Sequence, residues 1–446
     1  MAPRFGTDGI RGVAGVVLTP EVVVALGRAA ARVLGTSEPF LVARDTRRSG
    51  PMLEAAVIAG ICAEGGNVES YSILPTPGLA NACRLHTAPG VMISASHNPF
   101  GDNGVKLFAQ GGRKLRDEVE VNIGDVMLEM LSGAGSSLSG ASVGDSVRAP
   151  MPVAGYVNHL VGAVSSDALA GLSVVVDCGN GAAFRAAPEA LRLLGADVSV
   201  LNDSPDGMNI NAGCGSTDPT ALSQMVLELG ANAGLAFDGD ADRVIAVDER
   251  GGIVDGDHML AIFALDLMKQ GRLTGDAIVT TVMANLGLRR ALEPQGISVL
   301  ETPVGDRHVL AAMEGHGSVL GGEQSGHVIF AEHCPTGDGP MAGILLLDAA
   351  ARSGKPLSEL TAVITKYPQQ LRNVEVRDMD RLEGATGFWD EVGAATAELG
   401  NEGRVLVRPS GTEPVVRVMV EAPTSPQAVA IVERLSVALS NALGAP

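Results

Sequence analysis

Short apolar runs alternate along the chain with longer segments in which apolar residues recur every three or four positions. The runs predict buried strands, and the longer segments predict helices that cover them. In the first part of the chain, strands are predicted at 40–43, at 67–74 and around Val91, with helices at 52–62 and 78–85. Strands and helices that alternate at this spacing predict a parallel or mixed sheet with helices on both faces.

The alternation restarts twice, after a segment rich in Gly, Ser and Ala at 132–146 that predicts a surface linker. The strands predicted in these two later units are 172–177, 197–201, 233–237, 277–282 and 297–301. The helices predicted with them are 153–164, one ending at 194, 219–229, one beginning at 257 and one beginning at 286. In the final part of the chain, strands are predicted near Val374, Val405 and Val415, followed by a helix at 427–443.

This succession predicts an α/β protein of three mixed-sheet α/β domains followed by a smaller α+β C-terminal domain. The expected domain boundaries are 1–148, 149–250, 251–366 and 367–446. A chain of 446 residues is long enough for several domains with cores of their own. Because hydrophobic residues make up 46% of the chain and aromatic residues only 3%, those cores must be mainly aliphatic.

The charge balance restricts the partners. The formal net charge is −19, from 32 basic and 51 acidic residues, which argues against non-specific binding to nucleic acid or to an anionic membrane. Local arginine clusters can still bind phosphate. The five cysteines are odd in number and form no Cys-x-x-Cys pair, which is typical of reduced thiols in the cytoplasm. We expect no signal peptide and no membrane-spanning segment.

The segment 91–99 ends an apolar run in a polar loop, Ser94-Ala95-Ser96-His97-Asn98-Pro99. A strand that ends in such a loop holds a hydroxyl group at the edge of a sheet, where α/β proteins bind ligands. One interpretation is that Ser96 carries a phosphoryl group. The other is that Ser96 and Asn98 only satisfy backbone donors in a turn. Lys106 follows this loop and supplies a nearby amine.

Three carboxylates, those of Asp238, Asp240 and Asp242, alternate in a loop between two apolar runs. In a tight loop they converge and repel one another, and a divalent cation with oxygen ligands, such as Mg²⁺, removes that repulsion. An EF-hand is excluded because its sixth position would be Arg243, where a glycine is needed. The alternative is a solvated acidic turn.

Two further loops carry polar side chains beside glycines. The loop 321–327 presents Glu323, Ser325 and His327, which can hold sugar hydroxyls or an amine, although an ordinary hairpin loop has the same pattern. The loop 408–414 follows another apolar run. Its candidate phosphate-binding residues, together with the arginine that follows, are Arg408, Ser410, Gly411, Thr412 and Arg417. A glycine turn with exposed arginines is the alternative for this loop.

Taken together and in this order, these stretches resemble the α-D-phosphohexomutase family over the whole chain. The similarity is greatest to the bacterial members that act on glucosamine phosphates, and rests on the start at 4–12, on 205–211 with 214–217, and on 323–327. Relatives that act on mannose or glucose phosphates commonly have another residue at Gln324. Ala241 stands where the metal loop often has glycine, and we expect only a restriction of its backbone angles. The resemblance implies four domains around a central cleft, each contributing one loop.

The resemblance also implies roles for individual residues. Ser96 is the phosphoserine, and together with Asp238, Asp240 and Asp242 it binds one Mg²⁺. Lys106, Arg11 and His327 assist proton transfer or stabilise charge. The residues expected to bind the substrate are Arg243, Glu323, Ser325, Arg408, Ser410, Gly411, Thr412 and Arg417.

The implied reaction interconverts glucosamine 6-phosphate and glucosamine 1-phosphate through a 1,6-bisphosphate, and glucosamine 1,6-bisphosphate is the expected activator. The expected partner is a small-molecule sugar phosphate, with no nucleic acid and no membrane, and a homodimer is the candidate assembly. Two alternatives stay open. One is a mutase for mannose or glucose phosphates, and the other is a sugar-phosphate sensor that has lost turnover.

Overall fold

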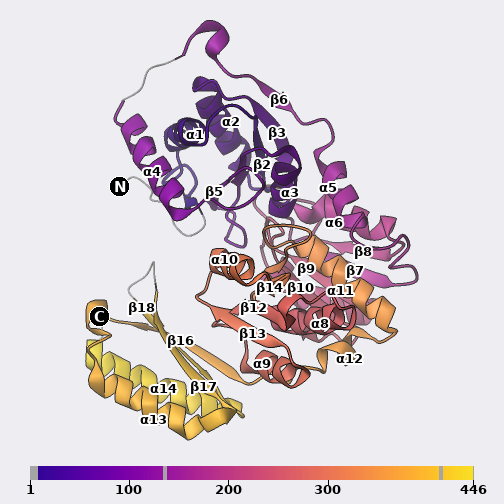
Figure 1. Ribbon diagram of the computed structural model, residues 1–446, viewed down its shortest axis with the longest axis vertical. Helices are drawn as coiled ribbons and strands as arrows, with labels where there is room; N and C mark the ends of the chain where they lie inside the picture. Colours follow the sequence, from indigo (N-terminus) through magenta and orange to yellow (C-terminus); the bar gives the residue numbers. More distant parts are fainter. Residues whose placement is uncertain (1–8, 134–137, 411–414, 445–446) are drawn as a thin grey trace. The chain divides into compact units, whose positions relative to one another are not determined.

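The computed structural model describes residues 9–133, 138–410 and 415–444 (Figure 1). By its internal contacts the chain divides into two compact units. The larger unit combines Met1–Met283 with Ile297–Val363, and the smaller combines Ala284–Gly296 with Ile364–Pro446. A short segment from the third predicted domain thus groups with the C-terminal part of the chain.

The first sheet of the larger unit has six strands in the order β1-β5-β4-β2-β3-β6. These strands are β1 (Ile10–Val13), β2 (Phe40–Arg44), β3 (Val68–Ile73), β4 (Gly90–Ile93), β5 (Asp102–Phe108) and β6 (Ser146–Arg148). β2, β3, β4 and β6 are parallel, whereas β5 is antiparallel to both β4 and β1. The helices of this part are α1 (Pro20–Leu34), α2 (Gly50–Ala63), α3 (Thr76–His86) and α4 (Asp117–Leu131). Aliphatic residues of the sheet and of α1, α2 and α4 form one core cluster.

The second and third sheets of the larger unit are also mixed, in the orders β11-β10-β9-β7-β8 and β13-β12-β14-β15. The strands of the second are β7 (Ser173–Asp177), β8 (Asp197–Leu201), β9 (Ala233–Phe237), β10 (Val244–Asp248) and β11 (Ile253–Val254). Those of the third are β12 (Ala277–Thr281), β13 (Ser298–Thr302), β14 (Leu320–Gly322) and β15 (Val328–Phe330). The helices are α5 (Pro152–Val161), α6 (Ala183–Leu193), α7 (Thr220–Leu229), α8 (Gly256–Lys269), α10 (Asp306–His316), α11 (Gly339–Ser353) and α12 (Leu357–Thr361).

The smaller unit has one antiparallel sheet with α13 and α14 packed against it (Figure 1). Its elements are α9 (Leu286–Leu292), β16 (Gln369–Glu375), α13 (Thr386–Leu399), β17 (Arg404–Pro409), β18 (Val415–Glu421) and α14 (Ser425–Leu443). The side chain of Asn285 exchanges two hydrogen bonds with the backbone of Tyr367, at 2.9 and 3.0 Å. The amide of Leu286 donates to the buried carboxylate of Glu421 at 3.0 Å. These bonds attach α9 to the C-terminal sheet.

All four sheets share one local arrangement. A strand runs into a loop and returns as its antiparallel neighbour, in the pairs β4–β5, β9–β10, β14–β15 and β17–β18. In the first three sheets the first strand of the pair also has a parallel neighbour on its other side. The four loops singled out from the sequence are the turns of these four hairpins. The fold therefore presents each candidate loop at the end of a strand that the rest of its sheet holds in place.

The fold class is confirmed: three mixed sheets are followed by a smaller antiparallel one. The strands predicted by number lie within two residues of the observed strands. The helices α1, α4 and α13 were not among the predicted elements, and neither was the pairing of β6 with β3. All residues of β6 are exposed, so it carries no apolar signal.

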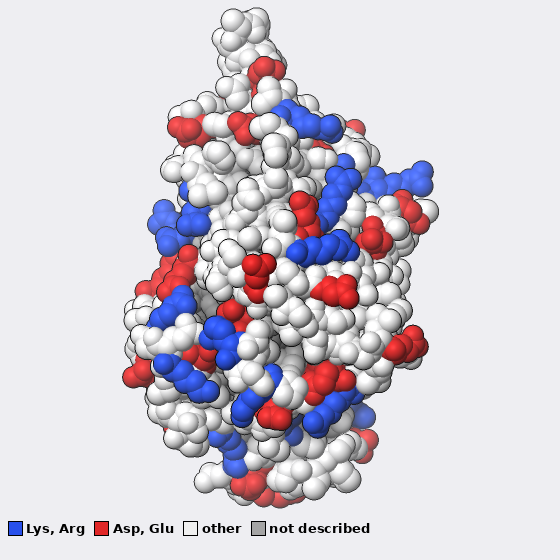
Figure 2. All heavy atoms as spheres, turned by 90° about the vertical axis from the view of Figure 1, so that its right-hand side faces the viewer, with Lys and Arg blue, Asp and Glu red and all other residues white. Residues whose placement is uncertain are grey.

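No helix in the described residues is long and apolar enough to cross a bilayer. Figure 2 shows basic and acidic side chains interspersed over one face.

A buried carboxylate links α5 to the start of α11. Asp338 caps α11, because its Oδ1 accepts a hydrogen bond from the amide of Met341 at 2.9 Å. The hydroxyl of Tyr156, on α5, donates to the same oxygen at 2.6 Å. Burial raises the pKa of Asp338 to about 6, although both hydrogen bonds favour the charged form. The second oxygen, Oδ2, is buried with no hydrogen-bond partner.

We expect Asp338→Asn to remove a pH dependence of stability. A carboxyl whose pKa is raised on folding stabilises the folded state while protonated, and that contribution is lost as the pH rises from about 4 through about 6. The amide of asparagine keeps the accepting oxygen and stays neutral. The free energy of unfolding of the wild type, relative to the variant, should therefore fall by about 2 kcal/mol between pH 4.5 and 7. Urea unfolding followed by circular dichroism measures it.

The exposed Asp167→Asn is the control for the loss of one charge. A difference between wild type and Asp338→Asn that stays constant with pH would contradict the prediction.

Candidate active site

The candidate nucleophile, Ser96, lies in the β4–β5 turn with 1% of its surface exposed. Its backbone is left-handed, with φ at 53°, which is uncommon for a residue other than glycine. Its hydroxyl donates to Oδ2 of Asp238 at 2.6 Å and lies 3.3 Å from Nδ1 of His97. The hydroxyl therefore points at the acidic turn of the second sheet and not at its own backbone.

The acidic turn between β9 and β10 gathers three buried carboxylates. Asp238, Asp240 and Asp242 each place one oxygen within 4.8 Å of the others. One oxygen of Asp240 and one of Asp242 are buried without a hydrogen-bond partner. The other oxygen of each of these two carboxylates lies near Lys106, whose Nζ is 2.9 Å from Asp240 Oδ2 and 3.6 Å from Asp242 Oδ2. Three converging carboxylates with unused oxygens fit a divalent cation with hard oxygen ligands.

The charges of this turn are divided unequally. Burial, together with repulsion from the other two carboxylates, raises the pKa of Asp238 well above its ordinary value. Burial acts in the same direction on Asp242, but Lys106, His327 and Arg243 hold the pKa of that carboxyl well below its usual range. The turn therefore resists carrying three full negative charges, and a divalent cation would offset the repulsion.

Two small residues shape the acidic turn. Ala241 has a left-handed backbone, with φ at 58°, a conformation that glycine adopts more readily than alanine. This conformation costs a non-glycine residue roughly 1 kcal/mol. Gly239 faces the β4–β5 turn so closely that a Cβ atom there would lie 2.5 Å from the carbonyl oxygen of Ser96. Any side chain at 239 would push the two turns apart.

The third hairpin turn contributes His327 and Glu323. His327 is buried, its Nε2 accepts a hydrogen bond from the amide of Gly337 at 3.0 Å, and its Nδ1 lies 3.8 Å from Asp242 Oδ2. This pattern places the ring proton on Nδ1, facing Asp242. Glu323 Oε1 accepts from the amide of Gly305 at 3.2 Å. Ser325 is exposed at the tip of the turn.

Arginines surround the same region. The amide of Arg243 donates to Asp238 Oδ1 at 3.2 Å, and its guanidinium Nη1 lies 3.1 Å from Nδ1 of His97. Burial lowers the pKa of His97 to about 4, and Arg243 and Arg11 lower it further by repulsion. Arg11 lies on β1, paired with Gly104 of β5.

The phosphate-binding candidates lie in the smaller unit, on the β17–β18 hairpin. Arg408 and Arg417 are directly opposite each other in the register. Burial and repulsion from Arg417 lower the pKa of Arg408, and its Nε is buried without a partner. Two like charges side by side are unfavourable unless an anion joins them. The amide of Ser410 donates to the carbonyl of Val415 at 2.9 Å. Gly411 and Thr412 lie outside the described residues.

Models of all four domains of one family match the chain. They are the phosphoglucomutase/phosphomannomutase α/β/α domains I (residues 2–132), II (154–252) and III (255–367) and the C-terminal domain (371–436). The chain belongs to the phosphoglucomutase/phosphomannomutase family. It is therefore a phosphohexomutase, as the sequence resemblance implied.

Similar proteins cover nearly the whole chain. A phosphoglucosamine mutase of Desulforudis audaxviator is 50% identical over 439 residues, which is 98% of this chain and 97% of that one. A phosphoglucosamine mutase of Thermobifida fusca is 49% identical over 443 residues, 98% of each. A crystal structure of a phosphoglucomutase/phosphomannomutase family protein from Burkholderia thailandensis has 26% identity, a TM-score of 0.83, and covers 100% of this chain and 99% of that one.

Sequence reasoning missed several residues of this phosphohexomutase that touch the site. Thr76, at the start of α3, donates its hydroxyl to Asp240 Oδ2 at 2.6 Å and its amide to the Asp240 carbonyl at 2.9 Å. The adjacent Pro77 signals a helix start, but nothing local signals the contact. Arg47 follows β2 in a polar stretch that suggests an arginine on a turn, but its side chain is fully buried, with 0% of its surface exposed.

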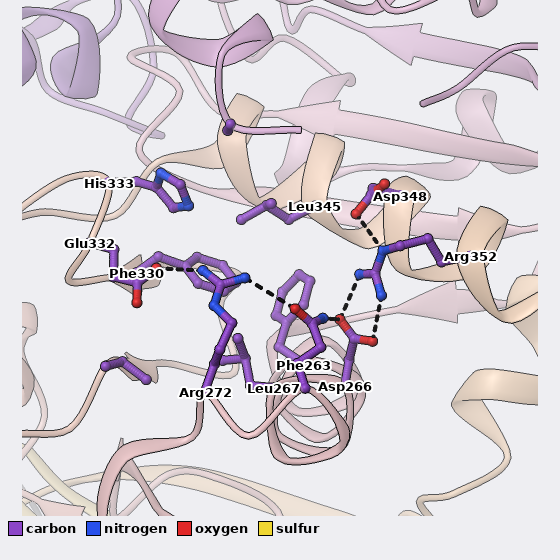
Figure 3. A pocket seen from close by; sticks show the side chains of 13 residues that line it. Phe263, Asp266, Leu267, Arg272, Phe330, Glu332, His333, Leu345, Asp348 and Arg352 are labelled. Carbon is purple, nitrogen blue, oxygen red and sulfur yellow. Dashed lines mark hydrogen bonds and ion pairs between the residues drawn. The ribbon is translucent and has the colours of Figure 1, made fainter. Parts of the chain in front are cut away.

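The pocket in Figure 3 lies away from these residues and contains none of the predicted site residues. It is bounded by α8, α11 and the segment after β15, and its cavity volume is about 90 Å³. Phe263 and Phe330 meet there edge to face, with ring centroids 4.8 Å apart. Arg272 pairs with Glu332, and Arg352 pairs with two aspartates of the rim. Two arginines therefore face three carboxylates, and the pocket offers no surplus positive charge that selects a phosphate.

Asp240→Asn should weaken binding of Mg²⁺ by at least about 10-fold, because one of three anionic ligands becomes neutral. Turnover should fall with it. The melting temperature without metal should stay the same or rise, because the remaining carboxylates repel each other less. Isothermal titration with Mg²⁺ and thermal unfolding measure the two effects.

The control is Asp248→Asn, at the far end of β10, where the side chain only accepts hydrogen bonds from backbone amides. Wild-type affinity for Mg²⁺ in Asp240→Asn would show that these carboxylates do not form the metal site.

Proposed function

We propose that this phosphohexomutase interconverts glucosamine 6-phosphate and glucosamine 1-phosphate through a phosphoserine at Ser96 and a 1,6-bisphosphate. One observation carries the proposal: the Ser96 hydroxyl, 2.6 Å from Asp238, lies at the acidic turn. The chain that contains this arrangement is about half identical, over 98% of its length, to the two phosphoglucosamine mutases described above. All five cysteines are free, which suits the expected cytoplasmic location.

Each half-reaction moves one phosphoryl group. The free sugar hydroxyl attacks the phosphorus of phospho-Ser96, a sugar O–P bond forms, and the bond between phosphorus and Ser96 Oγ breaks. The proton of the sugar hydroxyl leaves to a base of the site, and the departing Ser96 Oγ takes up a proton. The bisphosphate then reverses its orientation, and the Ser96 hydroxyl attacks the phosphorus of its other phosphate. A new bond between Ser96 Oγ and phosphorus forms, and the bond between that phosphorus and the sugar oxygen breaks. Ser96 Oγ loses its proton and the sugar oxygen takes one up, which releases the product and restores the phosphoserine.

We assign the metal-binding role to Asp238, Asp240, Asp242 and the Ser96 phosphate. Mg²⁺ bound there would neutralise the phosphoryl oxygens as charge shifts between them. Lys106, held by the same carboxylates, supplies positive charge on the opposite side. Arg11 and Arg243 bring further positive charge to the turn.

His327 is better suited to orienting than to accepting a proton. One ring nitrogen accepts from Gly337 and the other faces Asp242, so both are already used. We therefore assign His327 to fixing Asp242, and leave Arg11 and Lys106 as the groups that assist proton transfer.

The sugar would be held by Glu323 and Ser325, and the Glu323 carboxylate can pair with the ammonium group of an amino sugar. The phosphate that is not reacting would bind the hairpin of the smaller unit, through Arg408, Ser410, Gly411, Thr412 and Arg417. A cradle of paired arginines accepts either phosphate of the bisphosphate equally well. Glucosamine 1,6-bisphosphate is the expected activator, because it can reload Ser96.

The first test compares sugars. The value of kcat/KM should be at least 10-fold higher for glucosamine phosphate than for glucose or mannose phosphates. The reason is that glucose and mannose phosphates have no ammonium group, so the carboxylate that would pair with it stays unpaired when they bind. Coupled assays on the three sugar phosphates measure this. A preference for glucose or mannose phosphate would favour the mannose and glucose mutases, and binding without turnover would favour a sensor.

The second test concerns the phosphoryl carrier. Ser96→Ala should stay folded and lose mutase activity by several orders of magnitude, because no oxygen remains to carry the group. Dephosphorylated wild type should regain activity with catalytic glucosamine 1,6-bisphosphate, and labelled bisphosphate should mark the peptide that contains Ser96.

Ser72→Ala is a matched control, since Ser72 is another serine of the same sheet with a left-handed backbone, φ 55°. Full activity in Ser96→Ala, or label on another residue, would overturn the assignment.

A further inference from the structure

The β4–β5 turn is held by an arginine that no ligand can reach. The guanidinium of Arg47 is fully buried and all five of its N–H groups are used. Nε donates to Asp45 Oδ2 at 2.8 Å. The four remaining N–H groups donate to backbone carbonyls of the turn, those of Ser96, Asn98, Pro99 and Asp102.

A second side chain reaches the same oxygens from another sheet. Nδ2 of Asn211 donates to the carbonyl of Ser96 at 2.9 Å and to that of Asn98 at 3.3 Å. Arg47 Nη2 approaches these two oxygens at 2.9 and 2.8 Å. The backbone carbonyls of Ser96 and Asn98 therefore each accept two hydrogen bonds. One comes from Arg47, and the other comes from Asn211 in the loop after β8.

Asp45 is connected to the backbone amide of Ser96 through the side chain of Ser94. The amide of Ser96 donates to Ser94 Oγ at 2.9 Å, and the Ser94 hydroxyl donates to Asp45 Oδ2 at 2.7 Å. The same carboxylate holds Arg47, whose guanidinium binds the carbonyl of Ser96. Both polar groups of the Ser96 backbone are thus connected to one buried carboxylate, and the left-handed conformation of Ser96 is fixed from both sides.

We propose that Arg47 and Asn211 are positioning residues that hold Ser96 Oγ in line for phosphoryl transfer. Ser96 must carry and release a phosphoryl group repeatedly without a change in the direction of its side chain. An arginine near a phosphoserine would normally bind the phosphate. Arg47 cannot, because Asp45 neutralises it and every N–H is used, one on the Asp45 carboxylate and four on backbone carbonyls. It can therefore fix the turn in both states of Ser96.

This inference rests on the proposed role of Ser96 as phosphoryl carrier. If Arg47 and Asn211 act on the chemical step, their loss should lower kcat and leave KM for the sugar phosphate within about twofold, since neither touches the predicted substrate-binding side chains. A misplacement on the order of 1 Å costs up to about 100-fold in rate. We expect a 10- to 100-fold loss of kcat in Asn211→Gly and in Arg47→Lys.

Each variant has a matched control. Asn202→Gly also replaces a left-handed asparagine of the second sheet, φ 51° against 57° for Asn211, but its Nδ2 donates to Asp177 and not to the turn. Arg44→Lys changes a neighbouring arginine that pairs with Glu54. Both controls should keep the wild-type kcat. Glycine suits a positive φ, so Asn211→Gly keeps the inference testable even if Arg47→Lys does not fold.

The deciding measurement is the rate at which dephosphorylated enzyme takes up label from glucosamine 1,6-bisphosphate. The values of kcat and KM of each variant are also measured separately. Slow loading of Ser96 with unchanged Mg²⁺ affinity supports the inference. Loading and kcat at wild-type rates in folded Asn211→Gly, or a raised KM with normal kcat, would overturn it. Wild type that takes up no label on Ser96 would instead overturn the proposed function.

Discussion

Three carboxylates removed from water beside one serine hydroxyl are costly to bury together, and residues of the first and third sheets and of α3 compensate for that cost. At separations up to 4.8 Å, each charged pair would repel by roughly 3 kcal/mol at an effective dielectric constant of about 20. The compensating groups come from outside the acidic turn. Lys106 lies on β5 of the first sheet, Thr76 begins α3, and His327 follows β14 of the third sheet. No sheet of the larger unit therefore holds the turn without the other two.

The turn of a β-hairpin is a suitable place for such groups. Each of the four candidate loops joins two adjacent antiparallel strands, so its two ends are fixed about one strand spacing apart. In a turn of this kind, successive side chains point in sharply different directions, and a left-handed residue determines which of them faces inward. Ser96 and Ala241 both have that conformation, at the two turns that touch each other. The contact is close enough that only glycine fits at 239.

What the sequence could predict follows from how local each signal is. An apolar run that ends in a polar loop is visible within ten residues, so the strands and the candidate loops around Ser96 and Asp238 could be located. The roles of Arg47 and Thr76 depend on atoms more than 45 positions away in the chain, such as the carbonyl of Ser96 and the carboxylate of Asp240. An arginine on a turn looks the same whether it binds a phosphate or the backbone. Likewise β6 is exposed and pairs along one edge only, so neither its burial nor its period reveals it.

The assignment of Ala284–Gly296 to the smaller unit has a consequence for the order in which the chain can fold during synthesis. This segment leaves the ribosome about 70 residues before Tyr367 and well before Glu421, the two residues that hold it. Until they emerge, α9 lacks the hydrogen bonds that Asn285 and Leu286 make to them in the finished protein. The third sheet must meanwhile join β12 to β13 around this waiting segment. Completion of the smaller unit is thus tied to the last part of the chain, and a nascent chain that stalls near 366 would hold α9 without the residues that attach it, an incompletely folded state that is prone to aggregation.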